Sequence, residues 1–193
     1  MNTLLDIDAS LVAVNRQGAQ GAVKTWEDLD RYEKVLEATQ PELIIECGTY
    51  RGGSAVWFAE HGIDVITIDI TPAYIEHPRV TFLLASSSVA WWVVGSVERL
   101  AADRRTMVVL DSDHSGPHVA KEIRTYGGFV TPGCYLVVED GIVRWMTGLP
   151  YDGSPLDAIE SELDGNPDWV RDEEIEDMYP VTMFPAGWWR RAS

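Results

Sequence analysis

LIIECGTYRGGSAVWFAEHGIDVITIDI, residues 43–70, is the stretch that decides the fold. The pattern predicts an apolar strand that runs into Glu46, a glycine-rich turn, a helix, and a second apolar strand that ends at Asp69. Glycine lets the backbone of such a turn approach a ligand closely, because no Cβ stands in the way. An acid about 20 residues beyond the turn is placed to bind a ribose diol. The stretch therefore predicts a strand–helix–strand unit that binds an adenosine-bearing cofactor.

The order of the glycines separates one cofactor from another. A dinucleotide fold uses G-x-G-x-x-G to hold a pyrophosphate at the start of a helix. Residues 46–54 are E-C-G-T-Y-R-G-G-S, so the G-x-G is missing and Glu46 precedes the turn. A carboxylate there would repel a pyrophosphate but suits the ammonium group of S-adenosylmethionine. The sequence favours S-adenosylmethionine over NAD, and an ordinary turn that uses glycine only for its geometry is the alternative.

Beyond this unit, short apolar runs alternate with helical patterns. A capping box at Thr25–Asp28 predicts a helix that continues to Thr39. The alternation predicts an α/β fold with a doubly wound, mostly parallel, Rossmann-like sheet, whose ligands lie at the carboxyl ends of the strands. The expected strands are 43–47, 64–69, 80–85, 106–111 and 134–139, and the expected helices are 53–61, 88–101 and 116–126.

The two ends of the chain are less regular. We expect one domain over residues 1–193, with 1–24 as an N-terminal arm or flap and 141–193 as a variable, substrate-side region. The acid-rich run 152–177 is interpreted as a solvated face with a helix at 155–164, and VTMFPAGWWRR at 181–191 as a final strand or one half of a hairpin. Trp91 and Trp92 are expected to pack in the core.

Composition limits the partners and the compartment. The formal net charge of −16 over 193 residues disfavours nucleic acid and anionic membranes. The N-terminal MNTLLDIDAS has neither the basic residues nor the apolar core of a signal peptide, and the apolar run 89–94 is too short to span a bilayer. Cys47 and Cys134 are expected to be buried and reduced, which predicts a cytoplasmic protein.

A second constellation of polar residues lies in residues 107–143. One predicted strand runs into Asp111-Ser-Asp113-His114 and the next into Glu139-Asp140, so their carboxylates should meet at one edge of the sheet. Converging carboxylates repel each other unless a cation lies among them, and hard oxygen ligands suit Mg²⁺. Asp113, Glu139 and Asp140 are the predicted metal ligands. Asp111 is the rival for the first of these places, or contacts the cofactor. The alternative is that these acids cap helices and bind water.

Two histidines follow the first acids. His114 adjoins the proposed metal site and can either take a proton from a substrate hydroxyl or position the substrate. Asp113 and His114 are therefore the catalytic candidates. His118 lies four residues further on, but Pro117 and the missing glutamate of H-E-x-x-H argue against a zinc pair. No G-x-S-x-G is present, which argues against a serine hydrolase.

Five segments resemble one known family: IIECGTYRGGSAVWFA (44–59), LASSS (84–88), LDSDHSGPHVAKEI (110–123), YLVVEDGIV (135–143) and, less closely, FPAGWWRR (184–191). The chain is similar to the cephalosporin hydroxylase and rhamnosyl O-methyltransferase group of class I S-adenosylmethionine-dependent methyltransferases. The similarity covers residues 25–143 well and the tail loosely. Phe184 stands where a polar residue is expected in relatives.

The resemblance implies S-adenosylmethionine and Mg²⁺ as cofactors and transfer of a methyl group to an oxygen. The metal would lie on Asp113, Glu139 and Asp140, the ribose on Asp69 and the adenine edge near Ser86 and Ser87. The remaining residues expected near the cofactor are Glu46, Gly48, Thr49, Tyr50, Gly53, Ser54 and Asp111.

The acceptor is expected to be a hydroxyl of a small molecule, which can be a sugar, a phenol or a natural-product intermediate. Trp145 and Met146 follow the metal acids and are candidates for the acceptor wall. The resemblance is compatible with a homo-oligomer. Two alternatives are an NAD(P)-dependent oxidoreductase and a non-catalytic accessory protein that binds the cofactor. Retention of all three acids argues against the latter, and the missing G-x-G against the former.

Overall fold

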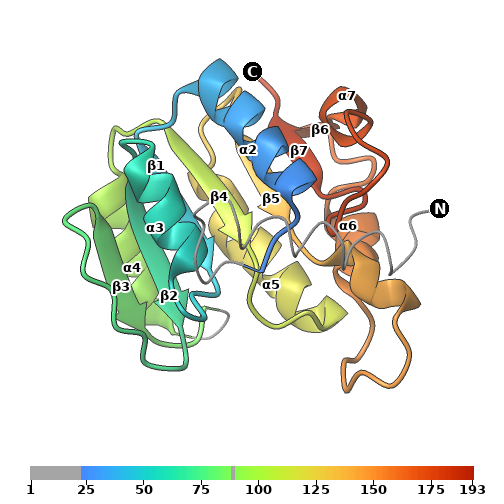
Figure 1. Ribbon diagram of the computed structural model, residues 1–193, viewed down its shortest axis with the longest axis horizontal. Coiled ribbons are helices and arrows are strands. Elements are labelled where there is room, and N and C mark those ends of the chain that lie inside the picture. The colour runs from blue at the N-terminus through green and yellow to red at the C-terminus, as the bar shows by residue number, and fades with distance from the viewer. Residues whose placement is uncertain (1–22, 88–89) are drawn as a thin grey trace.

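The computed structural model describes residues 23–87 and 90–193 (Figure 1). Most of the expected N-terminal arm, with Gly18 and Gly21, lies outside the described residues. The same is true of residues 88–89, where the helix 88–101 was expected to begin.

In the described part of the chain, seven strands form one sheet in the order β3-β2-β1-β4-β5-β7-β6. The pairs among the first five strands in this order are parallel, and β7 runs antiparallel to both β5 and β6. The predicted doubly wound, mostly parallel sheet is therefore confirmed. The strands are β1 Leu43–Cys47, β2 Asp64–Asp69, β3 Val80–Leu84, β4 Thr106–Leu110, β5 Tyr135–Val138, β6 Trp169–Arg171 and β7 Trp188–Arg191.

The strand order reverses between β1 and β4. From β1 the chain moves outward through β2 to β3, and it then returns to place β4 on the other side of β1 (Figure 1). The loops after β1 and β4 therefore diverge over the same point of the sheet. Open parallel sheets bind their ligands at such a switch point, outside the carboxyl ends of the strands.

Helices cover both faces of the sheet. Along β1 the side chains alternate, so that Leu43 and Ile45 join a core cluster with α4 and α5, while Ile44 joins one with α2 and α3. Strands buried in this way on both faces are mostly apolar, as β1 is apart from Glu46. The helices are α2 Trp26–Thr39, α3 Gly53–Glu60, α4 Trp91–Ala101, α5 Gly116–Tyr126 and α6 Pro155–Glu162.

Local signals fix where the helices begin. The hydroxyl of Thr25 accepts a hydrogen bond from the Asp28 backbone N–H at 3.1 Å, which confirms the predicted cap of α2. Pro117 lies in the first turn of α5, where its missing N–H leaves no bond unmade. The predicted bounds of α2, α5, β1 and β2 match the structure, and the other predicted elements differ by a few residues at their ends.

The acid-rich tail presents a solvated face as expected, because its acidic side chains are exposed or half-exposed, and it also contains β6 and the short helix α7 Glu173–Glu176. Two expectations about exposure were wrong. Strand β3 is the edge of the sheet and is half-exposed rather than covered on both faces. Trp91 and Trp92 are 84 % and 44 % exposed, because α4 turns Val93 and Val97 toward the sheet.

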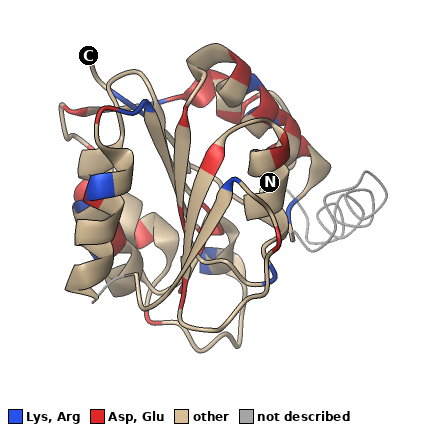
Figure 2. Ribbon diagram, turned by 90° about the vertical axis from the view of Figure 1, so that its left-hand side faces the viewer, with Lys and Arg blue, Asp and Glu red and all other residues tan. Residues whose placement is uncertain are grey.

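Acidic side chains are distributed over several elements (Figure 2). Both cysteines are buried and unpaired, as expected. Among the described residues, no helix combines the length and the apolar character that a membrane crossing needs.

Candidate active site

The turn after β1 passes directly against the end of β4. Gly48 has φ +96°, and a Cβ on it would lie 1.8 Å from the carbonyl oxygen of Asp111. The Asp111 N–H donates to the Cys47 carbonyl at 2.7 Å, and the Gly48 N–H donates to the Ile68 carbonyl at 2.8 Å. Glycine is required here both for its conformation and for its size. The ends of β1, β2 and β4 are thus fixed together at the switch point.

Glu46 lies buried beneath this turn. Its carboxylate accepts hydrogen bonds from the hydroxyls of Ser54 at 2.5 Å and Thr67 at 2.6 Å. Burial raises the pKa of Glu46 to about 7, although the two hydroxyls oppose the shift. Gly53 and Ser54 form the buried first turn of α3. The result is an acid under the turn whose charge changes near neutral pH.

Asp69, at the end of β2, holds the turn from its other side. One carboxylate oxygen accepts the N–H groups of Thr49 and Tyr50, each at 2.9 Å, and the other accepts the Thr71 N–H at 2.7 Å. Tyr50 is exposed and has a positive φ of 47°. Asp69 therefore lies at the end of β2, as predicted for the acid that would bind a ribose. It also organises the turn, a role that the sequence did not reveal.

The serines expected near an adenine lie on the loop after β3. The hydroxyl of Ser87 donates to Glu122 of α5, and Ser112 donates to the same carboxylate oxygen at 2.7 Å. His118 Nε2 lies 3.2 Å from that oxygen, and this contact raises the pKa of His118. The pairing fits the interpretation of His118 as an ordinary helix residue. Ser86 accepts the Ala90 N–H through its carbonyl at 3.2 Å.

Asp111, His114 and Asp140 form a candidate metal site. Each offers one ligand atom, and these atoms lie within 4.8 Å of one another. His114 Nε2 is 3.3 Å from a carboxylate oxygen of Asp140, which the left-handed backbone of Asp140 at φ 55° turns away from β5. Burial, followed by the charge of Asp111, raises the pKa of Asp140 to about 7. Two carboxylates in this arrangement fit Mg²⁺, whereas an imidazole suits it less well.

The structure places Asp113 and Glu139 outside that group. Asp113 is exposed and accepts the backbone N–H and the hydroxyl of Ser115, the residue that immediately precedes α5. Burial alone would raise the pKa of Asp113, but the two bonds from Ser115 and the nearby histidines together outweigh it, and the net shift is downward. Of the three predicted ligands, only Asp140 belongs to the cluster, together with the rival Asp111.

Glu139 is buried and has a partner on each oxygen. The Tyr32 hydroxyl donates to one at 2.5 Å, and the Lys24 ammonium donates to the other. Burial and the nearby Asp111 raise the pKa of Glu139 well above its ordinary value. The same ammonium lies 2.8 Å from a carboxylate oxygen of Asp111, so Glu139 borders the cluster through Lys24.

Sequence reasoning missed Lys24 and Tyr32. Lys24 was assigned to the arm, and one lysine before a helix cap carries no signal of a site. Tyr32 had a detectable signal, because the apolar spacing of α2 turns Tyr32, Val35 and Leu36 toward the sheet. Both residues lie on the segment that leads into β1, which shows that this segment contributes to the site.

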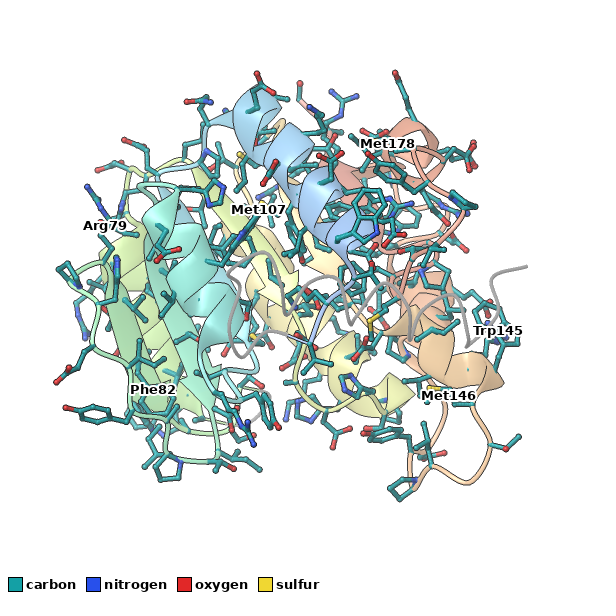
Figure 3. All side chains as sticks on the ribbon, in the orientation of Figure 1. Arg79, Phe82, Met107, Trp145, Met146 and Met178 are labelled. Carbon is teal, nitrogen blue, oxygen red and sulfur yellow. The ribbon has the colours of Figure 1, made fainter. Side chains whose placement is uncertain are left out.

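The aromatic side chains near the acids differ from those expected. Trp145 ends the 3-10 helix η2 Gly141–Trp145 and Met146 follows it, and their side chains are 58 % and 39 % exposed (Figure 3). Tyr151, instead, stands edge-on to His114 with 5.4 Å between the ring centroids. A concavity of about 790 Å³ lies at the opposite edge of the sheet, near His61 and Arg79, and has no contact with the acid cluster.

Comparison with known proteins identifies relatives over nearly the whole chain. A family model described as Rhamnosyl O-methyltransferase/CmcI matches residues 18–192. Rhamnosyl O-methyltransferase of Mycobacterium bovis (strain BCG) is 35 % identical over 179 residues, which cover 85 % of this chain and 73 % of that protein. The Mycobacterium leprae enzyme of the same name is 31 % identical over 180 residues, covering 86 % and 78 %.

Solved structures with the same fold include methyltransferases. A CmcI complex with Mg and SAM superposes with a TM-score of 0.64 at 20 % identity, over 89 % of this chain and 74 % of that one. MycE methyltransferase from the mycinamycin pathway, in complex with Mg, SAH and mycinamycin VI, gives 0.58 at 16 % identity. This match covers 79 % of the present chain and 46 % of MycE.

Proposed function

Because the chain belongs to the Rhamnosyl O-methyltransferase/CmcI family, it is an S-adenosylmethionine-dependent O-methyltransferase, and we propose that it methylates a small-molecule hydroxyl with the help of Mg²⁺. One observation carries the proposal. Asp111, His114 and Asp140 meet at the carboxyl edge of the sheet, directly beside the glycine turn after β1. Metal-assisted methyl transfer requires that the metal site lie next to the turn that binds the cofactor.

Residues of the first two strands would hold the cofactor. Glu46 lies under the turn as a buried acid that suits a cationic ammonium group, and Asp69 faces the turn from the end of β2. Gly48 keeps the backbone of the turn close to Asp111, so that cofactor and metal would lie beside each other. When bound, S-adenosylmethionine supplies a methyl group on a sulfonium, and the protein's part is to align the acceptor with it.

Asp111 and Asp140 would hold the metal ion, with Glu139 beside them. When bound, Mg²⁺ supplies positive charge that favours the ionised form of an acceptor hydroxyl. We favour Asp111 over Asp113, because Asp111 lies in the cluster and the Asp113 carboxylate is bonded to Ser115. The raised pKa of Asp140 supports a role as a ligand, since crowded, buried carboxylates gain most from a cation.

His114 would receive the proton of the acceptor hydroxyl. Its Nε2 faces Asp140 at 3.3 Å, and Tyr151 supports the ring from its edge. An imidazole oriented by a carboxylate is a common general base, and removing one costs about 10²–10⁴-fold in rate. The proton leaves the acceptor oxygen for His114 as the methyl group joins that oxygen, so no other base is needed.

A sugar hydroxyl is the first acceptor to examine. The curated relatives are named rhamnosyl O-methyltransferases, and a vicinal diol offers two oxygens to one cation. A phenol or a natural-product intermediate with neighbouring hydroxyls offers the same arrangement. The tyrosine that stands against His114 would form part of the acceptor wall.

Two measurements test the proposal. Calorimetric titration should give micromolar binding of S-adenosylmethionine, and labelled methyl transfer to a rhamnoside or a catechol should require Mg²⁺ and stop with EDTA. His114→Asn should lose activity and keep cofactor binding, while His61→Asn, at the opposite edge of the sheet, should retain both. Activity that EDTA leaves unchanged would contradict the metal-assisted mechanism.

A further inference from the structure

A buried ammonium lies in the middle of the acid site. Lys24 directly precedes the cap of α2 and is only 2 % exposed. Its Nζ lies 2.8 Å from Asp111 and also contacts Glu139. Among the described residues it is the one buried lysine, since Lys34 and Lys121 are exposed. Burial of an ammonium costs several kcal/mol unless it is paired, so these two carboxylates account for its position.

The neighbouring acids Glu139 and Asp140 have different partners. Glu139 points into the protein, where Tyr32 and Lys24 occupy its two oxygens. Asp140, with its left-handed backbone, faces His114. Asp111 lies between them, because it contacts Lys24 and also belongs to the candidate metal cluster. One carboxylate is therefore shared by a protein cation and a candidate site for a metal cation.

We propose that Lys24 is an internal counter-ion of the acid site, which pairs with Asp111 and Glu139 in the metal-free protein and competes with the divalent cation for Asp111. This inference rests on the proposed function, because it takes Asp111 as a metal ligand. Two cations that share one carboxylate repel each other, and the burial of Lys24 weakens the screening of that repulsion by solvent. Lys24 acts on the metal through Asp111 and Glu139 and is therefore a positioning residue.

A purely structural lysine would behave differently. Loss of a structural lysine would destabilise the protein to the same extent with and without metal, because two buried carboxylates lose their partner. Loss of a competing counter-ion also destabilises the metal-free protein, but it frees Asp111 for the metal. The metal should then bind more tightly and should restore the lost stability. The dependence on metal separates the two roles.

The test is calorimetric titration of MgCl₂ alone into wild type, Lys24→Met, Lys24→Arg and Lys34→Met. Lys24→Met should bind Mg²⁺ about tenfold or more tightly than wild type. Lys24→Arg keeps the charge and should bind as wild type does. Lys34→Met removes the same charge from the exposed side of α2 and should also match wild type. In thermal melts, Mg²⁺ should raise the Tm of Lys24→Met more than that of wild type.

The outcomes distinguish this inference from the proposed function. If wild type binds Mg²⁺ and Lys24→Met binds it equally or more weakly, the counter-ion role is overturned and the proposed function stands. If no variant binds Mg²⁺, the metal-assisted function fails and the inference fails with it. Binding by Lys24→Met alone supports strong competition. If Lys24→Met does not fold, Lys24→Gln replaces it, because its amide still donates to one of the carboxylates.

Discussion

Substitution of Gly48 by alanine should separate β1 from β4 at the switch point. The added Cβ would lie 1.8 Å from the Asp111 carbonyl oxygen and 2.4 Å from its carbon, and both are backbone atoms. Relief of the overlap requires the two strand ends to part by about 1.5 Å, which breaks the Asp111–Cys47 hydrogen bond. The left-handed backbone costs alanine about 1 kcal/mol, the lost hydrogen bond about 1 more, and the displaced packing about 2.

The free energy of unfolding should therefore fall by about 4 kcal/mol in Gly48→Ala. Gly62→Ala is the matched control, since Gly62 also has a positive φ of 85° but no atom within 4 Å of its added Cβ. It should lose only about 1 kcal/mol, from backbone strain alone. Urea unfolding followed by circular dichroism measures both. Equal losses in the two variants would refute the close approach at the switch point.

Three further perturbations have distinct readouts. His114→Asn should lower kcat about 10²–10⁴-fold with little change in S-adenosylmethionine affinity, as single-turnover rates can show. Glu46 ionises near 4.5 when unfolded and near 7 when folded, so its contribution is fully present below pH 4.5 and is lost as pH rises to 7. The free energy of unfolding of Glu46→Gln, measured with urea, should therefore rise relative to that of wild type by about 3 kcal/mol between pH 5 and pH 8. A difference in stability that stays the same over this pH range would contradict the raised pKa of the buried acid. Arg31→Met should lose about 3 kcal/mol and expose residues 172–187 to protease, because Arg31 is fully buried and donates to four backbone carbonyls of residues 175–181. Wild-type protease resistance in that variant would show that the tail is held by other contacts.

The parallel core of the fold was predictable from sequence. Each central strand is a run of apolar residues between turn signals, and burial on both faces requires such runs. The β6 strand was not predicted, because it is only three residues long and partly polar. It depends on pairing with β7 rather than on a sequence pattern of its own. The exposure of Trp91 shows the same limit, since helix orientation is set by the sheet beneath it.

The candidate site was predictable in outline only. Sequence placed acids at the carboxyl ends of β4 and β5, but it could not decide between Asp111 and Asp113, which lie two residues apart in a loop. The backbone of that loop turns Asp111 toward Asp140 and Asp113 toward Ser115. The pairing of Glu139 with Lys24 could not be predicted either, because the two residues are 115 positions apart in the sequence.

The most direct test of a metal-assisted site built on Asp111 is calorimetric titration of Mg²⁺ in the presence of S-adenosylmethionine, with Asp111→Asn and Asp113→Asn compared with wild type. Both variants remove one carboxylate and keep the side-chain shape. The account predicts that Asp111→Asn weakens Mg²⁺ binding tenfold or more and that Asp113→Asn stays within about threefold of wild type. Weak binding by Asp113→Asn and unchanged binding by Asp111→Asn would contradict the account and assign the metal to Asp113.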